Sequence, residues 1–208
     1  MNVVDQAPVK LARFYPIVPD IDWLERIVPL GVKLVQLRIK DATRADIVEQ
    51  TKRALALTRA NGCQLIVNDF WDVALETGAD FIHLGQDDLK EADLDRLKKA
   101  GVRVGISTHD ERELKIALAA DPDYVALGPV YETKLKAMPW APQGLERIEQ
   151  WRARIGRLPL VAIGGLTPDR APAVVAAGAD SLAVITDFVT APDPEARVRA
   201  WLHWAGAN

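Results

Sequence analysis

The segment VKLVQLRIK, residues 32–40, shows the pattern that determines the fold of this chain. It begins with an apolar run, Val32–Leu37, and places polar side chains at every second position near its end, at Gln36, Arg38 and Lys40. Alternate residues of an extended segment project to the same face, so these three side chains are expected to lie together. The segment therefore predicts a buried strand whose last residues contribute to a polar site.

Short runs rich in Val, Ile and Leu recur along the chain, and helical periodicity fills most of the gaps between them. The eight runs are Phe14–Val18, Val32–Leu37, Gln64–Val67, Phe81–Leu84, Arg103–Ile106, Tyr124–Leu127, Leu160–Ile163 and Ser181–Ile185. After the second run, apolar or small residues follow the spacing of a helix with one face on a sheet. They are Ile47, Val48, Thr51, Ala54, Leu55 and Thr58. This alternation predicts a parallel sheet covered by helices.

Eight strand-and-helix units in 208 residues favour a single closed (β/α)8 barrel. An open doubly wound sheet is the alternative that the same alternation permits. We expect the barrel to occupy residues 14–208, with residues 1–13 as an N-terminal extension that need not be ordered. In such barrels the working residues lie on the loops after the C-terminal ends of the strands.

Composition and charge restrict the classes of function. A net charge of −3 and an isoelectric point of about 5.7 lack the basic footprint of nucleic-acid binding. The first ten residues do not resemble a signal peptide, and no apolar run approaches the roughly 20 residues that span a membrane. Cys63 is the only cysteine, which suits a reducing compartment. We expect a cytoplasmic protein with small-molecule partners and no nucleic acid or membrane partner; a homo-oligomer is compatible with the sequence.

Polar residues follow several other apolar runs. Asn68 and Asp69 follow the third run, Gly85-Gln86-Asp87-Asp88 the fourth, and Ser107-Thr108-His109 the fifth. An aspartate after a strand is also a common helix cap, so Asp69 and Asp88 each have a structural alternative. Because a barrel gathers these strand ends around one mouth, we interpret them as one site.

The last runs end in groups suited to an anion. Gly165 follows the seventh run, Ile185 and Thr186 end the eighth, and these loops are a usual phosphate site in barrels. The segment Tyr131–Gly144 is longer than the about 2 to 6 residues of an ordinary connection. Its hydroxyl and cationic side chains suggest a lid over the anion; they are Thr133, Lys134 and Lys136.

A phosphorylated ligand beside Asp69 and Asp88 requires a cation. Each pair of like charges 4 Å apart repels by about 4 kcal/mol at an effective dielectric constant of 20. Mg²⁺ prefers oxygen ligands and commonly takes one or two carboxylates together with phosphate oxygens. Zinc is disfavoured because His83, His109 and His203 show no ligand spacing. The sequence therefore predicts Mg²⁺ held by Asp69 and Asp88.

A nucleophile and base pair is not expected. His109 lies two residues after Ser107, but nothing in the sequence identifies an acid that would orient it. His83 stands inside an apolar run, and we interpret it as a buried histidine with satisfied hydrogen bonds rather than as a catalyst.

In their order and spacing, seven motifs closely resemble the thiamine-phosphate synthase family. They are QLRIK, ND, HLGQDD, GISTH, LKAMPWAPQGL, AIGGL and Val184-Ile185-Thr186. The resemblance extends from Phe14 to about Ala196, and the set is specific although each motif is weak singly. It implies a barrel, Mg²⁺ and a transferase that condenses 4-amino-2-methyl-5-hydroxymethylpyrimidine diphosphate with 4-methyl-5-hydroxyethylthiazole phosphate. In this family diphosphate leaves first, and the thiazole nitrogen then captures the pyrimidine cation to give thiamine phosphate.

The resemblance also implies roles for individual residues. Those implied for the pyrimidine diphosphate are Gln36, Leu37, Arg38, Ile39, Lys40, Asn68, Ser107 and Lys136. Those implied for the thiazole phosphate are Thr133, Lys134, Leu135, Gly165, Ile185 and Thr186. Arg38, Lys40, Ser107 and Lys136 would be the catalytic residues, with Asp69 and Asp88 as metal ligands. Cations and metal ligands then outnumber candidate bases, as expected where the main task is to stabilise a departing diphosphate.

The chain departs from the family pattern at three places. Glu132–Lys136 lacks the proline and the second threonine of Pro-Thr-x-Thr-Lys, Thr186 replaces a serine, and Ile39 replaces the glutamate of QLREK. The first departure affects the contacts to the thiazole phosphate. Ile39 should point away from Arg38 and Lys40.

Two alternative functions remain open. A thiazole tautomerase of the same superfamily has a lid similar to Tyr131-Glu132-Thr133, but Pro129 stands where that enzyme would have a histidine. A tautomerase also does not need the diphosphate and Mg²⁺ residues. A non-catalytic binding or regulatory protein for thiamine precursors is suggested by Leu135, although such a protein would have little use for both Asp69 and Asp88.

Overall fold

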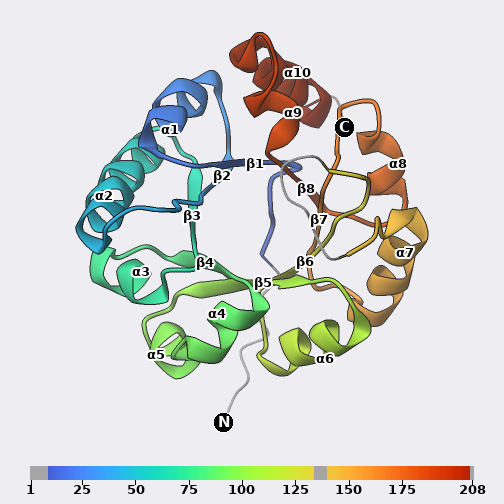
Figure 1. Ribbon diagram of the computed structural model, residues 1–208, viewed down its shortest axis with the longest axis horizontal. Coiled ribbons are helices and arrows are strands. Elements are labelled where there is room, and N and C mark those ends of the chain that lie inside the picture. Colours follow the sequence, from blue (N-terminus) through green and yellow to red (C-terminus); the bar gives the residue numbers. More distant parts are fainter. Residues whose placement is uncertain (1–8, 134–139, 207–208) are drawn as a thin grey trace.

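The computed structural model describes residues 9–133 and 140–206, which form a closed barrel of eight parallel strands inside a ring of helices (Figure 1). The strands are β1 (Phe14–Val18), β2 (Leu34–Leu37), β3 (Gln64–Asn68), β4 (Phe81–Leu84), β5 (Arg103–Thr108), β6 (Tyr124–Leu127), β7 (Leu160–Ile163) and β8 (Ser181–Val184). They pair in chain order, and β8 pairs with β1. The predicted (β/α)8 barrel is confirmed, and the open doubly wound sheet is excluded.

The helices follow the strands in the order expected of a barrel. They are α1 (Ile21–Ile27), the 3₁₀ helix η1 (Val28–Leu30), α2 (Arg44–Ala60), α3 (Trp71–Thr77), α4 (Gln86–Glu91), α5 (Leu94–Lys99), α6 (Glu111–Ala119), α7 (Gly144–Ile155), α8 (Ala171–Ala176), α9 (Thr186–Val189) and α10 (Pro194–Gly206). The six residues predicted to face the sheet from α2 are its buried residues. Within the described ranges, none of the helices combines the length and the apolar character that a membrane span requires.

Four strands differ from their predicted limits. β2 begins at Leu34 rather than Val32, and β8 ends at Val184 rather than Ile185. β3 continues to Asn68 and β5 to Thr108. Ladder hydrogen bonds join backbone groups, so a polar side chain at the mouth does not end a strand.

Apolar side chains form two clusters, one on each face of the barrel wall. The larger lies between the strands and the helices and includes the fully buried Trp151 and Trp201. The smaller fills the barrel interior. Its buried members are Leu11, Tyr15, Ile17, Leu34, Ile66, Phe81, Tyr124, Ala126, Val161 and Ala183. The interior is therefore a packed core, and a ligand can be held only above it, at the mouth.

Residues 9–13 pack onto the barrel ahead of β1. Leu11 is buried in the interior cluster, and the carbonyl of Ala12 accepts a hydrogen bond of 2.6 Å from Ser181 Oγ. This part of the predicted N-terminal extension thus contributes to the barrel core, while residues 1–8 lie outside the described residues.

Gly105 leaves room for an aromatic ring inside the barrel. It pairs in register with Tyr124 of β6, and a Cβ atom at Gly105 would lie 2.1 Å from carbon atoms of the Tyr124 ring. Tyr124 is fully buried, so neither the ring nor the strand can move freely.

We predict that Gly105→Ala lowers the free energy of unfolding by about 1–3 kcal/mol, because overpacking forces buried groups apart. Gly206→Ala is the matched control, since a Cβ there meets nothing within 4 Å and alanine favours a helix. Urea denaturation of both variants measures the difference. Equal stability of the two variants would show that Gly105 is not needed for this packing.

Candidate active site at the barrel mouth

The alternation of side chains along the strands brings the predicted site residues together. Gln36, Asn68 and His83 are buried, and each lies two residues after an interior apolar residue of its own strand. Ser107 stands two residues after Gly105 and is half-buried. These four side chains form a polar layer directly above the apolar interior.

Leu37 and Ile39 face the opposite side of the wall. Both are buried in the cluster between strands and helices. Their side chains cannot reach a ligand in the mouth, so any contact to the pyrimidine diphosphate is limited to their backbone. The orientation expected for Ile39 is confirmed.

Two carboxyl groups and one ammonium group converge after β2, β3 and β4. Lys40 Nζ donates a hydrogen bond of 2.6 Å to Asp69 Oδ2. Asp69 has a φ of 64°, an uncommon conformation for a residue other than glycine, and its amide donates to the carbonyl of His83. Partial burial, the charge of Asp69 and a side-chain hydrogen bond to Asp69 raise the pKa of Asp88 above its usual range. The ionised forms of the two carboxyl groups therefore repel each other, and the ion pair between Lys40 and Asp69 offsets only part of this repulsion.

Neither aspartate is the N-cap of the helix that follows it, but the Asp88 carboxyl accepts a hydrogen bond from the backbone N–H of Gly85 at the start of α4. The N-cap of α3 is Phe70 and that of α4 is Gly85, and neither N-cap residue makes a side-chain cap hydrogen bond. The cluster of Lys40, Asp69 and Asp88 carries a formal charge of −1 when all three groups are ionised, which suits a divalent cation. The described residues contain no group of three or more His, Cys, Asp or Glu side chains that could hold a metal ion. Two carboxylates alone can hold Mg²⁺ only where water and ligand oxygens complete its shell.

Asn68 has an unpaired hydrogen-bond donor. Its Nδ2 atom is buried, and no group within the described ranges accepts a hydrogen bond from it. Leaving a buried donor unpaired costs about 1–3 kcal/mol. A donor of this kind at the mouth is suited to a ligand oxygen.

A chain of hydrogen bonds crosses the polar layer. Gln36 Nε2 donates to the Tyr15 hydroxyl at 2.7 Å, which lies 3.0 Å from the Tyr124 hydroxyl. Tyr124 in turn lies 2.7 Å from His83 Nδ1, and His83 Nε2 lies 2.8 Å from Ser107 Oγ. The interpretation of His83 as a buried and satisfied histidine is confirmed. The sequence analysis did not identify either tyrosine, although both stand at inward positions of their strands.

Burial controls the protonation of this chain. It lowers the pKa of His83 to about 4, against a smaller raising effect of the Asp69 charge, so the imidazole is neutral at pH 7. It raises the pKa of both Tyr15 and Tyr124 well above 10. All five side chains of this hydrogen-bond chain are therefore neutral at pH 7.

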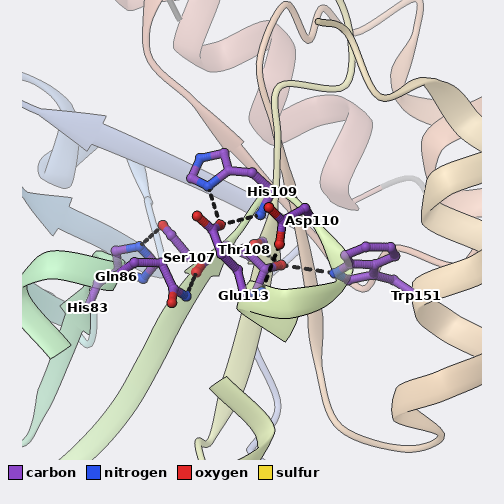
Figure 2. A network of polar contacts seen from close by, with 9 residues as sticks. His83, Gln86, Ser107, Thr108, His109, Asp110, Glu113 and Trp151 are labelled. Carbon is purple, nitrogen blue, oxygen red and sulfur yellow. Dashed lines mark hydrogen bonds and ion pairs between the residues drawn. The ribbon is translucent and has the colours of Figure 1, made fainter. Parts of the chain in front are cut away.

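The end of β5 is held from several sides, as Figure 2 shows. Gln86 Nε2 donates to the carbonyl of Ser107 at 2.7 Å, and Trp151 Nε1 donates to Thr108 Oγ1 at 2.9 Å. His109 Nδ1 lies 2.7 Å from Glu113 Oε2. Glu113 is the acid partner that sequence analysis missed, and its position four residues after His109 on a predicted helix was the available signal.

The residues predicted for the thiazole phosphate lie only partly within the described chain. Lys134 and Leu135 are outside the described residues, and so is Lys136, which was predicted for the pyrimidine diphosphate. Gly165 has a φ of 63°, and a Cβ there would lie 2.5 Å from the carbonyl oxygen of Glu132. This close approach is sufficient to require glycine at position 165, whether or not a ligand binds there. It also places the segment that leads to Thr133 beside the loop after β7.

Ile185 and Thr186 stand at the junction of β8 and α9. Ile185 packs against the interior cluster, and Thr186 is the first residue of α9. Thr186 is half-buried, so its hydroxyl is not enclosed by the core. The structure thus keeps this strand end at the same mouth as β2 to β5 (Figure 1).

Comparisons with known proteins agree on one family. A family profile described as thiamine monophosphate synthase matches residues 14–188. A thiamine-phosphate synthase of Rhizobium etli is 59% identical over 194 residues, covering 93% of this chain and 95% of the relative. One of Enterobacter sp. (strain 638) is 44% identical, with coverage of 93% and 92%. The solved thiamine phosphate pyrophosphorylase of Pyrococcus furiosus superposes with a TM-score of 0.82 at 27% identity, covering 94% of this chain and 96% of that one.

We predict that His83 makes folding sensitive to acid. Because its pKa is about 4 in the folded state and near 6.5 when unfolded, the unfolded state alone gains a proton between these values as pH falls. The contribution of His83 to the free energy of unfolding therefore decreases by about 2 kcal/mol between pH 7 and pH 5. Urea denaturation at several pH values should give a shallower acid dependence for His83→Gln.

The matched control is His203→Gln, which removes an exposed histidine of α10. If the stability curves of His83→Gln and the parent protein run parallel between pH 7 and pH 5, His83 is not the group responsible.

Proposed function

The chain belongs to the thiamine monophosphate synthase family, and we propose that it joins hydroxymethylpyrimidine diphosphate to hydroxyethylthiazole phosphate at the mouth of its barrel. It is a transferase of thiamine biosynthesis that acts on phosphorylated small molecules. The observation that supports the proposed site is the convergence of Lys40, Asp69 and Asp88 after three adjacent strands.

The diphosphate would lie beside this cluster. Arg38 and Lys40 supply positive charge, and Asn68 supplies the unpaired amide donor. The Lys40 side chain is about half exposed, so its ammonium group can exchange Asp69 for a phosphate oxygen. Asp69 and Asp88 would hold Mg²⁺, which when bound would neutralise part of the charge on the leaving diphosphate.

The reaction itself requires little from a protein base. The bond between the pyrimidine methylene carbon and the diphosphate oxygen breaks, and its electron pair leaves with diphosphate. The lone pair of the thiazole nitrogen then forms the new carbon–nitrogen bond. Arg38 and Lys40 stabilise the charge of the leaving group, while Gln36 and Ser107 would orient the aminopyrimidine.

The thiazole phosphate would lie opposite, near the ends of β7 and β8. Gly165, Ile185 and Thr186 supply backbone amides and a hydroxyl there, and Thr133 approaches from the loop after β6. The roles proposed for Lys134, Leu135 and Lys136 remain predictions from the family resemblance. The second reactant would thus lie across the mouth from the leaving diphosphate.

A thiazole tautomerase does not account for the same residues. Two carboxylates, a lysine and an unpaired amide lie at the ends of β2 to β4, and these groups suit a metal and a diphosphate. A tautomerase has neither as a reactant. We also propose the cytoplasm as the site of the reaction, because the sequence contains a single cysteine, Cys63, which is a buried free thiol and suits a reducing compartment.

We predict that the purified protein with both substrates and Mg²⁺ forms thiamine phosphate and diphosphate, and that EDTA abolishes the reaction. Chromatographic detection of thiamine phosphate over a range of Mg²⁺ concentrations measures this. Binding of both substrates without product at every Mg²⁺ concentration would instead support the non-catalytic binder.

We predict that Asp88→Asn lowers kcat by at least about 100-fold without lowering the thermal midpoint, because it removes a metal ligand and also relieves repulsion from Asp69. Asp87→Asn is the matched control, since the Asp87 side chain is 94% exposed and pairs only with the exposed Lys90 among the described residues. Loss of stability in proportion to loss of activity would assign Asp88 a structural role.

A further inference from the structure

We propose that the buried hydrogen-bond chain from Gln36 through Tyr15, Tyr124 and His83 orients the Ser107 hydroxyl, and that Tyr124 and His83 are positioning residues for the aminopyrimidine. The inference rests on the proposed function for the identity of the ligand. It concerns residues that contact Ser107 rather than the reacting atoms. Five strands contribute one residue each, namely β2, β1, β6, β4 and β5.

This hydrogen-bond chain is rigid because its side chains are buried and packed against one another. Tyr15 and Tyr124 are each no more than 1% exposed. The His83 ring stacks on Tyr124 with centroids 5.6 Å apart and an angle of 17° between the planes. Phe81 contacts Tyr124 edge-on at 5.6 Å, and the backbone at Gly105 leaves space for the ring. The hydroxyl groups therefore have few alternative partners.

The available donors and acceptors determine in which direction the hydrogen bonds run along this hydrogen-bond chain. The Gln36 amide donates to Tyr15, so the Tyr15 proton goes to the Tyr124 oxygen. Tyr124 then donates to His83 Nδ1, which leaves the proton of the neutral imidazole on Nε2. His83 Nε2 donates to Ser107 Oγ. The hydroxyl donors of Tyr15 and Tyr124 and the Nε2 donor of His83 are all paired in this arrangement.

This direction determines what Ser107 offers to a ligand. In this direction Ser107 Oγ accepts from His83 at the contact drawn in Figure 2. The proton of Ser107 is then free to point into the mouth. The opposite direction would turn the Ser107 proton inward and would leave the Tyr15 proton facing the Gln36 amide donor. An aminopyrimidine has ring nitrogens that accept hydrogen bonds, so the outward proton matches its chemistry.

The tautomer of His83 in the ligand-free protein tests the direction of these hydrogen bonds. Nitrogen-15 NMR of histidine side chains distinguishes a protonated ring nitrogen from an unprotonated one. We expect the proton on Nε2 of His83 at pH 7. A proton on Nδ1 would overturn the proposal whether or not the protein is a synthase, because the Ser107 hydroxyl would then have to donate to His83.

Ligand binding tests whether the Ser107 hydroxyl, oriented in this way, contributes to binding of the aminopyrimidine. Tyr124→Phe removes the donor to His83 Nδ1 and should raise the Kd of 4-amino-5-hydroxymethyl-2-methylpyrimidine phosphate on the order of tenfold, as for loss of one hydrogen bond. The Kd of inorganic diphosphate with Mg²⁺ should change less than about twofold, because that subsite lies at Lys40 and Asp69. Thr51→Val, which removes a buried hydroxyl of α2 that bonds the carbonyl of Ile47 and takes no part in this hydrogen-bond chain, serves as the control.

A double-mutant cycle separates positioning from folding effects. If Tyr124 acts through Ser107, Tyr124→Phe should have no further effect on pyrimidine binding in a Ser107→Ala background. An undiminished effect in that background, or equal weakening of the pyrimidine and the diphosphate, would overturn the proposal. Failure of the unmodified protein to form thiamine phosphate would count against the proposed function and leave the tautomer measurement decisive for the inference.

Discussion

Each strand of the barrel places successive side chains on opposite faces of the wall, and this alternation decides which residues can meet at the mouth. Outward positions pack against helices, and inward positions fill a space that eight strands make just wide enough for side chains. The inward series ends in polar residues on four neighbouring strands, namely Gln36, Asn68, His83 and Ser107. A shift of register by one residue would bury Arg38 under a helix and expose Leu37 and Ile39 to the mouth.

The apolar interior gives these polar groups their properties. Because the layer beneath them is packed, they have no solvent on that side, and each must find a partner or remain unsatisfied. Gln36, His83 and Ser107 find partners in the hydrogen-bond chain that runs through Tyr15 and Tyr124, and burial lowers the pKa of His83. Asn68 does not, and the charge of Asp69, which pairs with Lys40, raises the pKa of the neighbouring Asp88. The unfavourable features lie together on one side of the mouth, which is where a metal and a diphosphate would relieve them.

Much of the fold and of the site could be predicted because both follow from local patterns. Apolar runs and their spacing specify the barrel, and polar residues after the runs mark the mouth. The strand limits at Asn68 and Thr108 could not be predicted, because ladder pairing depends on the backbone and not on side-chain polarity. Tyr15 and Tyr124 were missed because they belong to apolar runs, and their hydroxyls meet only when β1 and β6 face each other across a closed barrel.

The proposed reaction requires Asp69 and Asp88 to hold a divalent cation against a diphosphate. Diffraction from crystals grown with Mn²⁺ and inorganic diphosphate tests it most directly, because Mn²⁺ gives an anomalous signal and replaces Mg²⁺ at oxygen sites. We expect one anomalous peak in contact with both carboxylates and the diphosphate, with Lys40 and Asn68 Nδ2 hydrogen-bonded to diphosphate oxygens. A diphosphate bound elsewhere, or a mouth in which Lys40 stays paired with Asp69 and no metal peak appears, would contradict it.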